Sequence, residues 1–146
     1  MPELPRHSVS VAGVVFNDSG EVLVIRRRDN GHWEPPGGVL ELHETVQAGA
    51  QREILEETGI LVTIGPLTGV YKNMKRGVVA LVFRCTEPRG SVRPTNETVA
   101  VEWMYPDRAM DAMAPAYAIR VADALRPNGR LIPRAHDGVD LLDAEL

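Results

Sequence analysis

Short apolar stretches separated by turn-forming residues dominate the start of the chain. Residues 8–17 (SVSVAGVVFN) and 21–28 (EVLVIRRR) are rich in β-branched and aliphatic side chains, so each stretch predicts a strand. Residues 17–20 (NDSG) lie between them and are of the types that turns favour. We therefore expect the two strands to form an antiparallel hairpin.

Residues 43–60 (HETVQAGAQREILEETGI) carry the clearest helical pattern. Thr45 is of a type that caps helix N-termini, and Gly59 suits the left-handed position that ends many helices. At about 100° per residue, the side chains of this segment fall on two contrasting faces. We predict a largely apolar face with Ala48, Gln51, Ile54 and Leu55, and an anionic face with Glu53, Glu56 and Glu57.

Strand patterns resume after this helix, and a second helix follows them. The predicted strands and helix lie, in order, at 61–73 with an interruption at 65–66, at 77–86, at 97–105 and at 115–125. Strands that pair mainly as hairpins, with helices packed outside them, make an α+β domain. We therefore predict a layered fold in which a mixed sheet lies between helices.

The segments outside these elements are rich in Gly and Pro. Residues 28–42 predict a structured loop with a short strand after Gly38. A chain of 146 residues fits one domain, which we assign to residues 1–126. Residues 127–146 predict a C-terminal extension that is either draped on the domain or disordered.

Charge and cysteine content exclude several classes of partner. The net charge is -4, and no basic stripe or long apolar run is present, so we expect neither nucleic acid nor a membrane as partner. A phosphate-rich substrate would need a local cationic site or a metal ion. The single cysteine, Cys85, predicts a buried and inert side chain, and together with the absence of a signal peptide it favours the cytoplasm.

Three glutamates on one helix face need an explanation, because like charges three or four residues apart destabilise a helix by roughly 0.2–0.5 kcal/mol per pair. Glu53, Glu56 and Glu57 have this spacing. One interpretation is a solvated face, which is common on exposed helices. The other is a site for a hard divalent cation, since Mg²⁺ takes carboxylate oxygens together with substrate phosphates. Gly37 and Gly38 upstream would let the backbone approach such a site closely.

The flanking residues favour the cation site, because they complete a longer pattern. Residues 38–60 read G-x5-E-x7-R-E-U-x-E-E-x-G-U, where U is a bulky aliphatic residue. This segment resembles the Nudix box, and the preceding WEPPGG resembles the usual lead-in of that family. Every fixed position is filled, by Gly38, Glu44, Arg52, Glu53, Ile54, Glu56, Glu57, Gly59 and Ile60.

The resemblance implies a MutT-like Nudix fold and a pyrophosphatase that hydrolyses nucleoside diphosphates linked to another moiety, using Mg²⁺ or Mn²⁺. It implies that Glu53, Glu56 and Glu57 hold the metal together with the carbonyl oxygen of Gly38. It also implies that Arg52 orients the carboxylates, through a salt bridge to Glu53.

The same resemblance gives Glu44 the role of supporting the loop and helix. It leaves the general base open among Glu53, Glu56 and Glu97, the last of which lies where some relatives supply a glutamate. A non-catalytic Nudix-fold sensor of a nucleotide or of ADP-ribose is the alternative function. Retention of every box carboxylate favours the enzyme.

The substrate contacts lie outside the box and are less specific. Arg26 and Arg28 end a strand that leads into the box loop, so we predict that they meet phosphate. Tyr71 is predicted to contact the substrate, and Trp33 and Trp103 are further aromatic candidates for stacking on a base. The sequence does not select one nucleotide among nucleoside triphosphates and nucleotide sugars, and it leaves a homodimer possible.

Overall fold

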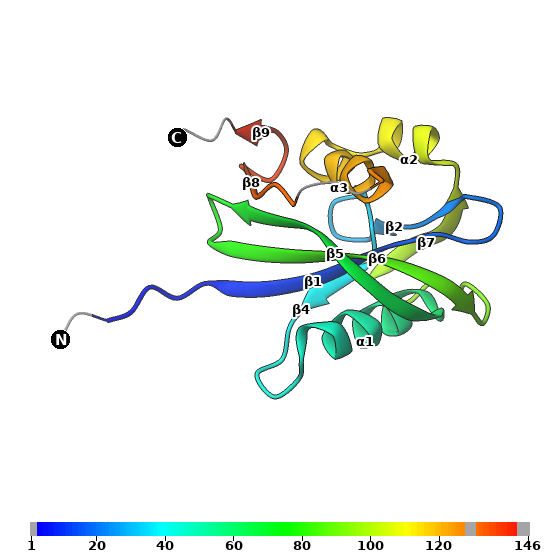
Figure 1. Cartoon of the computed structure of the whole chain (residues 1–146), viewed down its shortest axis with the longest axis horizontal. Coiled ribbons are helices and arrows are strands. Elements are labelled where there is room, and N and C mark those ends of the chain that lie inside the picture. The colour runs from blue at the N-terminus through cyan, green and yellow to red at the C-terminus, as the bar shows by residue number, and fades with distance from the viewer. Residues whose placement is uncertain (1–2, 128–130, 143–146) are drawn as a thin grey trace.

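The computed structural model describes residues 3–127 and 131–142. In Figure 1 the strands form a central layer, helix α1 lies on one side of it, and helices α2 and α3 lie on the other. The elements are β1 (Ser8–Val15), β2 (Val22–Arg27), β3 (Trp33–Glu34), β4 (Gly37–Val39), α1 (Val46–Thr58), β5 (Leu61–Asn73), β6 (Val78–Arg89), β7 (Thr98–Met104), α2 (Pro106–Ala112), α3 (Pro115–Leu125), β8 (Arg134–His136) and β9 (Leu141–Leu142).

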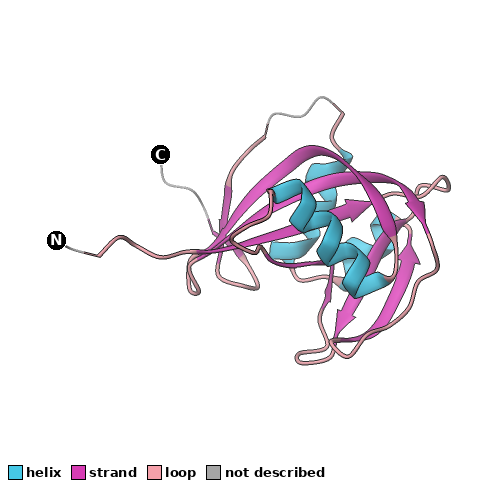
Figure 2. Cartoon of the chain, turned by 90° about the horizontal axis from the view of Figure 1, so that it is seen from below, coloured by secondary structure: helices cyan, strands magenta, loops and turns pink. Residues whose placement is uncertain are grey.

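The strands form two sheets. The larger sheet has the order β4-β1-β6-β5-β8-β9, and the smaller one has the order β3-β2-β7. β1 pairs with β6 in parallel and β5 pairs with β8 in parallel, whereas the other pairings are antiparallel. Figure 2 shows α1 lying across the strands of the larger sheet. The predicted α+β fold, with a mixed sheet between helices, is confirmed.

The predicted hairpin of the first two strands is wrong. β1 and β2 are joined only by one isolated bridge, between Phe16 and Val22. Both edges of β1 are taken by β4 and β6, and both edges of β2 are taken by β3 and β7. The turn after Phe16 therefore passes the chain from one sheet to the other instead of closing a ladder.

Side chains that alternate along β1 point into two different hydrophobic cores. Val11 and Val15 belong to the core that includes Ala50 and Ile54 of α1, and Ala12 and Val14 belong to the core that includes residues of α2 and α3. Gly13 lies where the helix comes closest, since an added Cβ would lie 2.5 Å from Ile54 Cδ1. The absent side chain at Gly13 thus lets α1 pack close to β1.

The ends of α1 are as predicted, but its buried face is not. The Thr45 side chain accepts a hydrogen bond from the Ala48 N–H, and Gly59 adopts the left-handed conformation with φ 81°. Leu55 is 38% exposed, whereas Glu57 is only 8% exposed. The helix is therefore rotated from the predicted orientation, and it buries Gly49, Ala50, Ile54, Glu57 and Thr58.

The remaining differences concern elements that carry weak sequence patterns. β5 is continuous through residues 65–66 but shifts register against β6. Helix α2 and strands β3, β8 and β9 were not predicted. β8 brings residues 134–136 of the predicted extension against β5. The parts of that extension at 128–130 and 143–146 lie outside the described residues.

Candidate active site

Arg52 joins three of the predicted carboxylates. Its guanidinium donates to both oxygens of Glu44, at 2.9 and 2.6 Å, and to Glu53 Oε1 at 2.9 Å and Glu56 Oε2 at 3.2 Å. The two-pronged contact with Glu44 is the stronger geometry. That contact is the main cause that lowers the pKa of Glu44 to about 2, so this carboxylate stays ionised. Glu44 thereby anchors Arg52, and Arg52 orients Glu53 and Glu56.

Glu57 occupies a different environment, although it lies next to Glu56 in sequence. Its side chain is buried, and its Oε1 accepts a hydrogen bond from the Gly37 N–H at 2.6 Å. Burial raises the pKa of Glu57 to about 8, and the charge of Glu53 adds to the shift. Among the described residues, no cation contributes to offset this cost, so the ionised form of Glu57 would be stabilised by an added cation.

Gly38 and Glu53 lie in direct contact. A Cβ added at Gly38 would collide with the carboxylate of Glu53, so only glycine fits at this position without displacing that side chain. Burial raises the pKa of Glu53 while Arg52 opposes the shift. The predicted glycine and glutamate ligands are thus adjacent, with the Gly38 backbone next to a carboxylate.

The donor set fits Mg²⁺ better than a metal that needs a complete protein cage. Glu53, Glu56 and Glu57 offer hard oxygen ligands around a single arginine, which leaves net negative charge. Within the described ranges, no three acidic, histidine or cysteine side chains converge as a preformed metal cage. Mg²⁺ is usually bound by one or two carboxylates, waters and substrate phosphates, so it does not need such a cage.

Glu97 lies close enough to this site for its charge to act on the box carboxylates. It lies immediately before β7, and its side chain is exposed. Its negative charge contributes to the raised pKa of Glu53 and of Glu57, after the larger effect of burial. The structure therefore brings Glu97 to the box carboxylates although more than thirty residues separate them in sequence.

The two predicted arginine contacts are held differently. Arg26 is exposed; its Nε donates to the Gly31 carbonyl at 3.0 Å, and its guanidinium lies 5.9 Å from the centre of the Trp33 ring. Arg28 instead donates through its side chain to the backbone carbonyls of Asn96 and Thr98. The guanidinium of Arg28 therefore contacts the segment that carries Glu97.

The structure contradicts the predicted contact of Tyr71 with the substrate. Tyr71 has no exposed surface, and its hydroxyl donates to Asp123 Oδ2 at 2.7 Å. The Arg120 guanidinium lies 4.8 Å from the centre of its ring. Both ends of the side chain are thus engaged inside the core. Of the other aromatic candidates, Trp33 and Trp103 are both half-buried.

Glu34 is a further carboxylate near Glu57 that the sequence analysis did not single out. It lies on β3, its side chain is 13% exposed, and Arg27 approaches it to 3.6 Å. Burial raises the pKa of Glu34, with Arg27 opposing, and the charge of Glu34 also acts on Glu57. In the sequence, Glu34 is visible only as the glutamate of the lead-in WEPPGG. A carboxylate at such a position would ordinarily be expected in an exposed loop.

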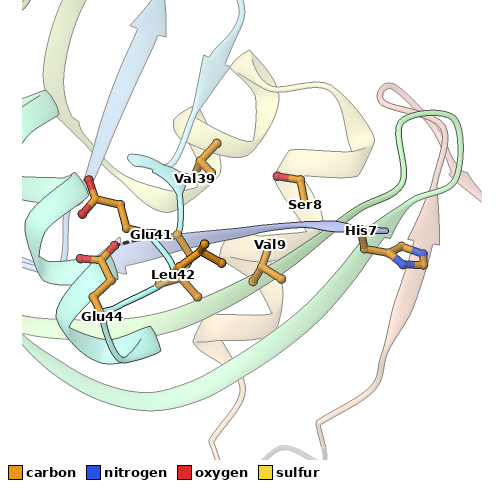
Figure 3. Close-up of a pocket in the computed structure, with 8 residues that line it drawn as sticks. His7, Ser8, Val9, Val39, Glu41, Leu42 and Glu44 are labelled. Carbon is orange, nitrogen blue, oxygen red and sulfur yellow. Dashed lines mark hydrogen bonds between the residues drawn. The ribbon is translucent and has the colours of Figure 1, made fainter. Parts of the chain in front are cut away.

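A pocket of about 300 Å³ lies on the other side of the box loop, between the start of β1 and residues 39–44. Figure 3 shows Glu41 and Glu44 at one end of this pocket and His7 at the other. Glu44 already accepts from Arg52 and from the Glu41 N–H. The other residues that line the pocket are mainly aliphatic, and Glu53, Glu56 and Glu57 are not among its lining residues.

Comparison with known proteins assigns the family. A family profile described as the NUDIX domain matches residues 6–125. The chain belongs to the Nudix family. A MutT-like protein of Streptomyces ambofaciens is 56% identical over 140 residues, which cover 96% of this chain and 90% of the relative.

Two further relatives agree with the Nudix assignment. A Bacillus subtilis protein that is provisionally named an 8-oxo-dGTP diphosphatase is 32% identical over 103 residues, covering 70% of this chain and 69% of the relative. The crystal structure of a MutT protein from Bacillus halodurans superposes with a TM-score of 0.78 at 24% identity, covering 93% of this chain and 95% of that one. The chain is thus a Nudix hydrolase with a MutT-like fold, and hydrolases of this family generally need a divalent metal ion.

None of the helices in the described ranges combines the length and the apolar character that crossing a bilayer requires.

Proposed function

We propose that the chain hydrolyses a pyrophosphate bond in a nucleoside diphosphate linked to another moiety, with Mg²⁺ or Mn²⁺ as the cofactor. The observation that carries this proposal is the excess of carboxylates over cations around Arg52. Glu44, Glu53 and Glu56 all contact Arg52, while Glu57 is buried near them without a cationic partner in the part of the chain that the structure describes. Such an arrangement costs stability unless it binds a cation.

In this proposal, Glu53, Glu56 and Glu57 hold the metal ion together with the carbonyl oxygen of Gly38. When bound, the ion supplies neutralisation of the phosphate oxygens and activation of water. Arg52 fixes the directions of Glu53 and Glu56 through the contacts at 2.9 and 3.2 Å. Glu44 supports the site indirectly, because it determines where the Arg52 guanidinium lies.

The proton of the attacking water goes to a carboxylate that is not fully committed to other contacts. Glu53 and Glu56 each accept a hydrogen bond from Arg52, so one oxygen of each carboxylate is already engaged. Glu97 is exposed, lies just before β7, and is close enough to Glu53 and Glu57 for its charge to act on both. We therefore favour Glu97 as the general base, with Glu53 and Glu56 as the alternatives.

The proposed substrate is a nucleoside triphosphate or a nucleotide-sugar-like molecule. The relatives are named for different activities, including 8-oxo-dGTP diphosphatase and ADP-ribose pyrophosphatase, so they support the reaction class and not one substrate. Arg26 is exposed and near the half-buried Trp33, which makes it the stronger of the two predicted arginine contacts for phosphate. Tyr71 has no place in the proposed contacts.

A nucleotide panel tests this function. Canonical and 8-oxo nucleoside triphosphates, ADP-ribose and nucleotide sugars would be incubated with Mg²⁺ or Mn²⁺, and released phosphate, pyrophosphate and nucleotide monophosphate measured. We expect turnover of at least one compound, its loss with EDTA, and its loss in Glu56→Gln but not in the control Glu87→Gln, which changes an exposed glutamate of β6. Tight nucleotide binding without any turnover would contradict the enzyme and favour the sensor.

Two further features are proposed together with this function. A cytoplasmic enzyme and a homodimer both suit the chain, and neither determines the chemistry proposed for the box. Light scattering coupled to size-exclusion chromatography would measure the assembly, with a mass near twice 16.0 kDa expected for the dimer.

A further inference from the structure

The turn that carries Glu97 is held by its own side chains. The Thr95 N–H donates to Thr98 Oγ1 at 2.9 Å, and the Glu97 N–H donates to Thr95 Oγ1 at 3.2 Å. Thr98 is fully buried at the start of β7. The Glu97 carboxylate, by contrast, is exposed and has no hydrogen bond or ion pair to any other residue that the structure describes. The backbone is thus fixed while the side chain stays free.

Arg28 binds the backbone of the same turn through three hydrogen bonds. Its backbone N–H donates to the Glu97 carbonyl at 2.9 Å. Its Nε donates to the Asn96 carbonyl at 3.0 Å, and its Nη2 donates to the Thr98 carbonyl at 3.4 Å. Three consecutive carbonyls therefore accept from one residue. A planar guanidinium can direct two donors in this way, whereas a lysine has only one ammonium group at its end.

The sheet alone does not hold the turn in this position. β2 and β7 pair regularly up to Arg26 and Ala100, and the register then shifts, so that Arg27 lies opposite Thr98. Val99 is the additional residue of this irregularity. A bulge of this kind interrupts the ladder and redirects the chain beyond it. The contacts of Arg28 lie directly past the bulge, where regular strand pairing has ended.

We propose that Arg28 is a positioning residue for the reaction, which holds the 95–98 turn and so keeps the Glu97 carboxylate near Glu53 and Glu57. This inference rests on the proposed function, in which Glu97 accepts the proton. Arg28 does not touch the substrate in this account. Its neighbour in sequence, Arg27, is bound instead to Asp29 and lies near Glu34, so it cannot replace these contacts.

Steady-state kinetics of a double-mutant cycle test the proposal. The variants are Arg28→Ala, Glu97→Gln and the double variant, with Arg108→Ala as a matched control because Arg108 is an exposed arginine of α2. General-base catalysis contributes about 10²–10⁴-fold, and misplacement of a reacting group can cost about 10²-fold. We therefore expect Arg28→Ala to lower kcat at least about tenfold, with KM within about twofold of the wild-type value.

The coupling distinguishes positioning from substrate binding. If Arg28 acts through Glu97, the double variant will be no slower than Glu97→Gln alone. Arg28→Lys will not restore kcat, because the forked contact is lost although the charge is kept. A raised KM, multiplicative effects in the double variant, or rescue by lysine would show that Arg28 binds phosphate and would overturn the proposal.

Amide hydrogen exchange separates this inference from the proposed function, because it needs no turnover. In Arg28→Ala we expect the amides of Glu97 and Thr98 to exchange at least about tenfold faster, while those of α1 keep their wild-type rates. Unchanged protection at residues 97 and 98 would overturn the role of Arg28, whatever the activity. A wild-type chain without turnover on the nucleotide panel would instead reject the proposed function, and the exchange data would still decide whether Arg28 holds the turn.

Discussion

Two clusters of charged residues in this molecule differ in their ratio of carboxylates to arginines. The box cluster consists of Glu44, Arg52, Glu53, Glu56 and Glu57. The Asp123 cluster consists of Tyr71, Asp123, Arg126 and Arg134. In the Asp123 cluster one carboxylate receives the Tyr71 hydroxyl at 2.7 Å, both prongs of Arg134 at 2.8 Å, and Arg126 at 3.4 Å.

The box cluster has the opposite ratio, since it holds four carboxylates and one arginine, and three of those carboxylates, Glu44, Glu53 and Glu56, contact the arginine. The protein itself therefore neutralises the carboxylate of the Asp123 cluster, whereas the box cluster keeps a net negative charge. A satisfied buried cluster fixes structure, and here it joins α3 to β5 and β8. An unsatisfied one is poised for a cation. The difference lies in the partners of the carboxylates and not in the number of acidic residues alone.

The largest expected effect is on activity, from removing one charge of the box cluster. Glu57→Gln keeps an oxygen that can accept from the Gly37 N–H, so the fold should persist. It removes a proposed metal ligand, and metal ions contribute several kcal/mol to charge stabilisation in such reactions. We expect kcat to fall by about 10²–10³-fold, measured on the best substrate of the panel, with the unfolding temperature not below that of the wild type.

The next effect is on stability, from breaking the Asp123 cluster. Removing one partner of a buried ion pair costs about 3–5 kcal/mol, and the partial exposure of Arg134 places Asp123→Ala at the lower end, about 3 kcal/mol. Urea denaturation would measure this loss. Activity per folded molecule should remain near the wild-type value. A loss of activity without loss of stability would remove the distinction between the two clusters.

A smaller effect is the pH dependence of stability in the metal-free protein. The folded pKa of Glu57 is about 8 because of burial, above the ordinary 4.5. The folded state therefore holds its proton more tightly, so this contribution to stability is complete below pH 4.5 and is lost as the pH rises through about 8. With EDTA present, the wild type should lose stability relative to Glu57→Gln over this range, measured by thermal unfolding. Parallel pH profiles for the two proteins would contradict the buried state of Glu57.

The box was predictable because its spacing is local. The carboxylates, the Thr45 cap and the Gly59 end all follow from residues within one helix, and the structure places them accordingly. The orientation of that helix was not predictable in the same way. Glu57 is buried because the Gly37 backbone offers a hydrogen bond at 2.6 Å, which depends on a strand that lies twenty residues earlier.

The errors come from partners that are distant in sequence. The pattern of β1 and β2 predicts strands correctly, but it does not say that β6 takes the edge where β2 was expected. Tyr71 has an aromatic ring that could stack on a base. Its hydroxyl is instead bonded to Asp123, which lies 52 positions away in the sequence. Arg28 likewise has partners that its place in the sequence does not reveal, because the carbonyls that it binds belong to Asn96 and Thr98.

Equilibrium binding of Mn²⁺, measured by isothermal titration calorimetry, tests most directly whether the box cluster is the cation site. The account predicts saturable binding to the wild type, at least about tenfold weaker binding to Glu57→Gln and Glu56→Gln, and unchanged binding to the control Glu87→Gln. Equal affinity in all four proteins, or no saturable binding to the wild type with or without a nucleotide present, would contradict it.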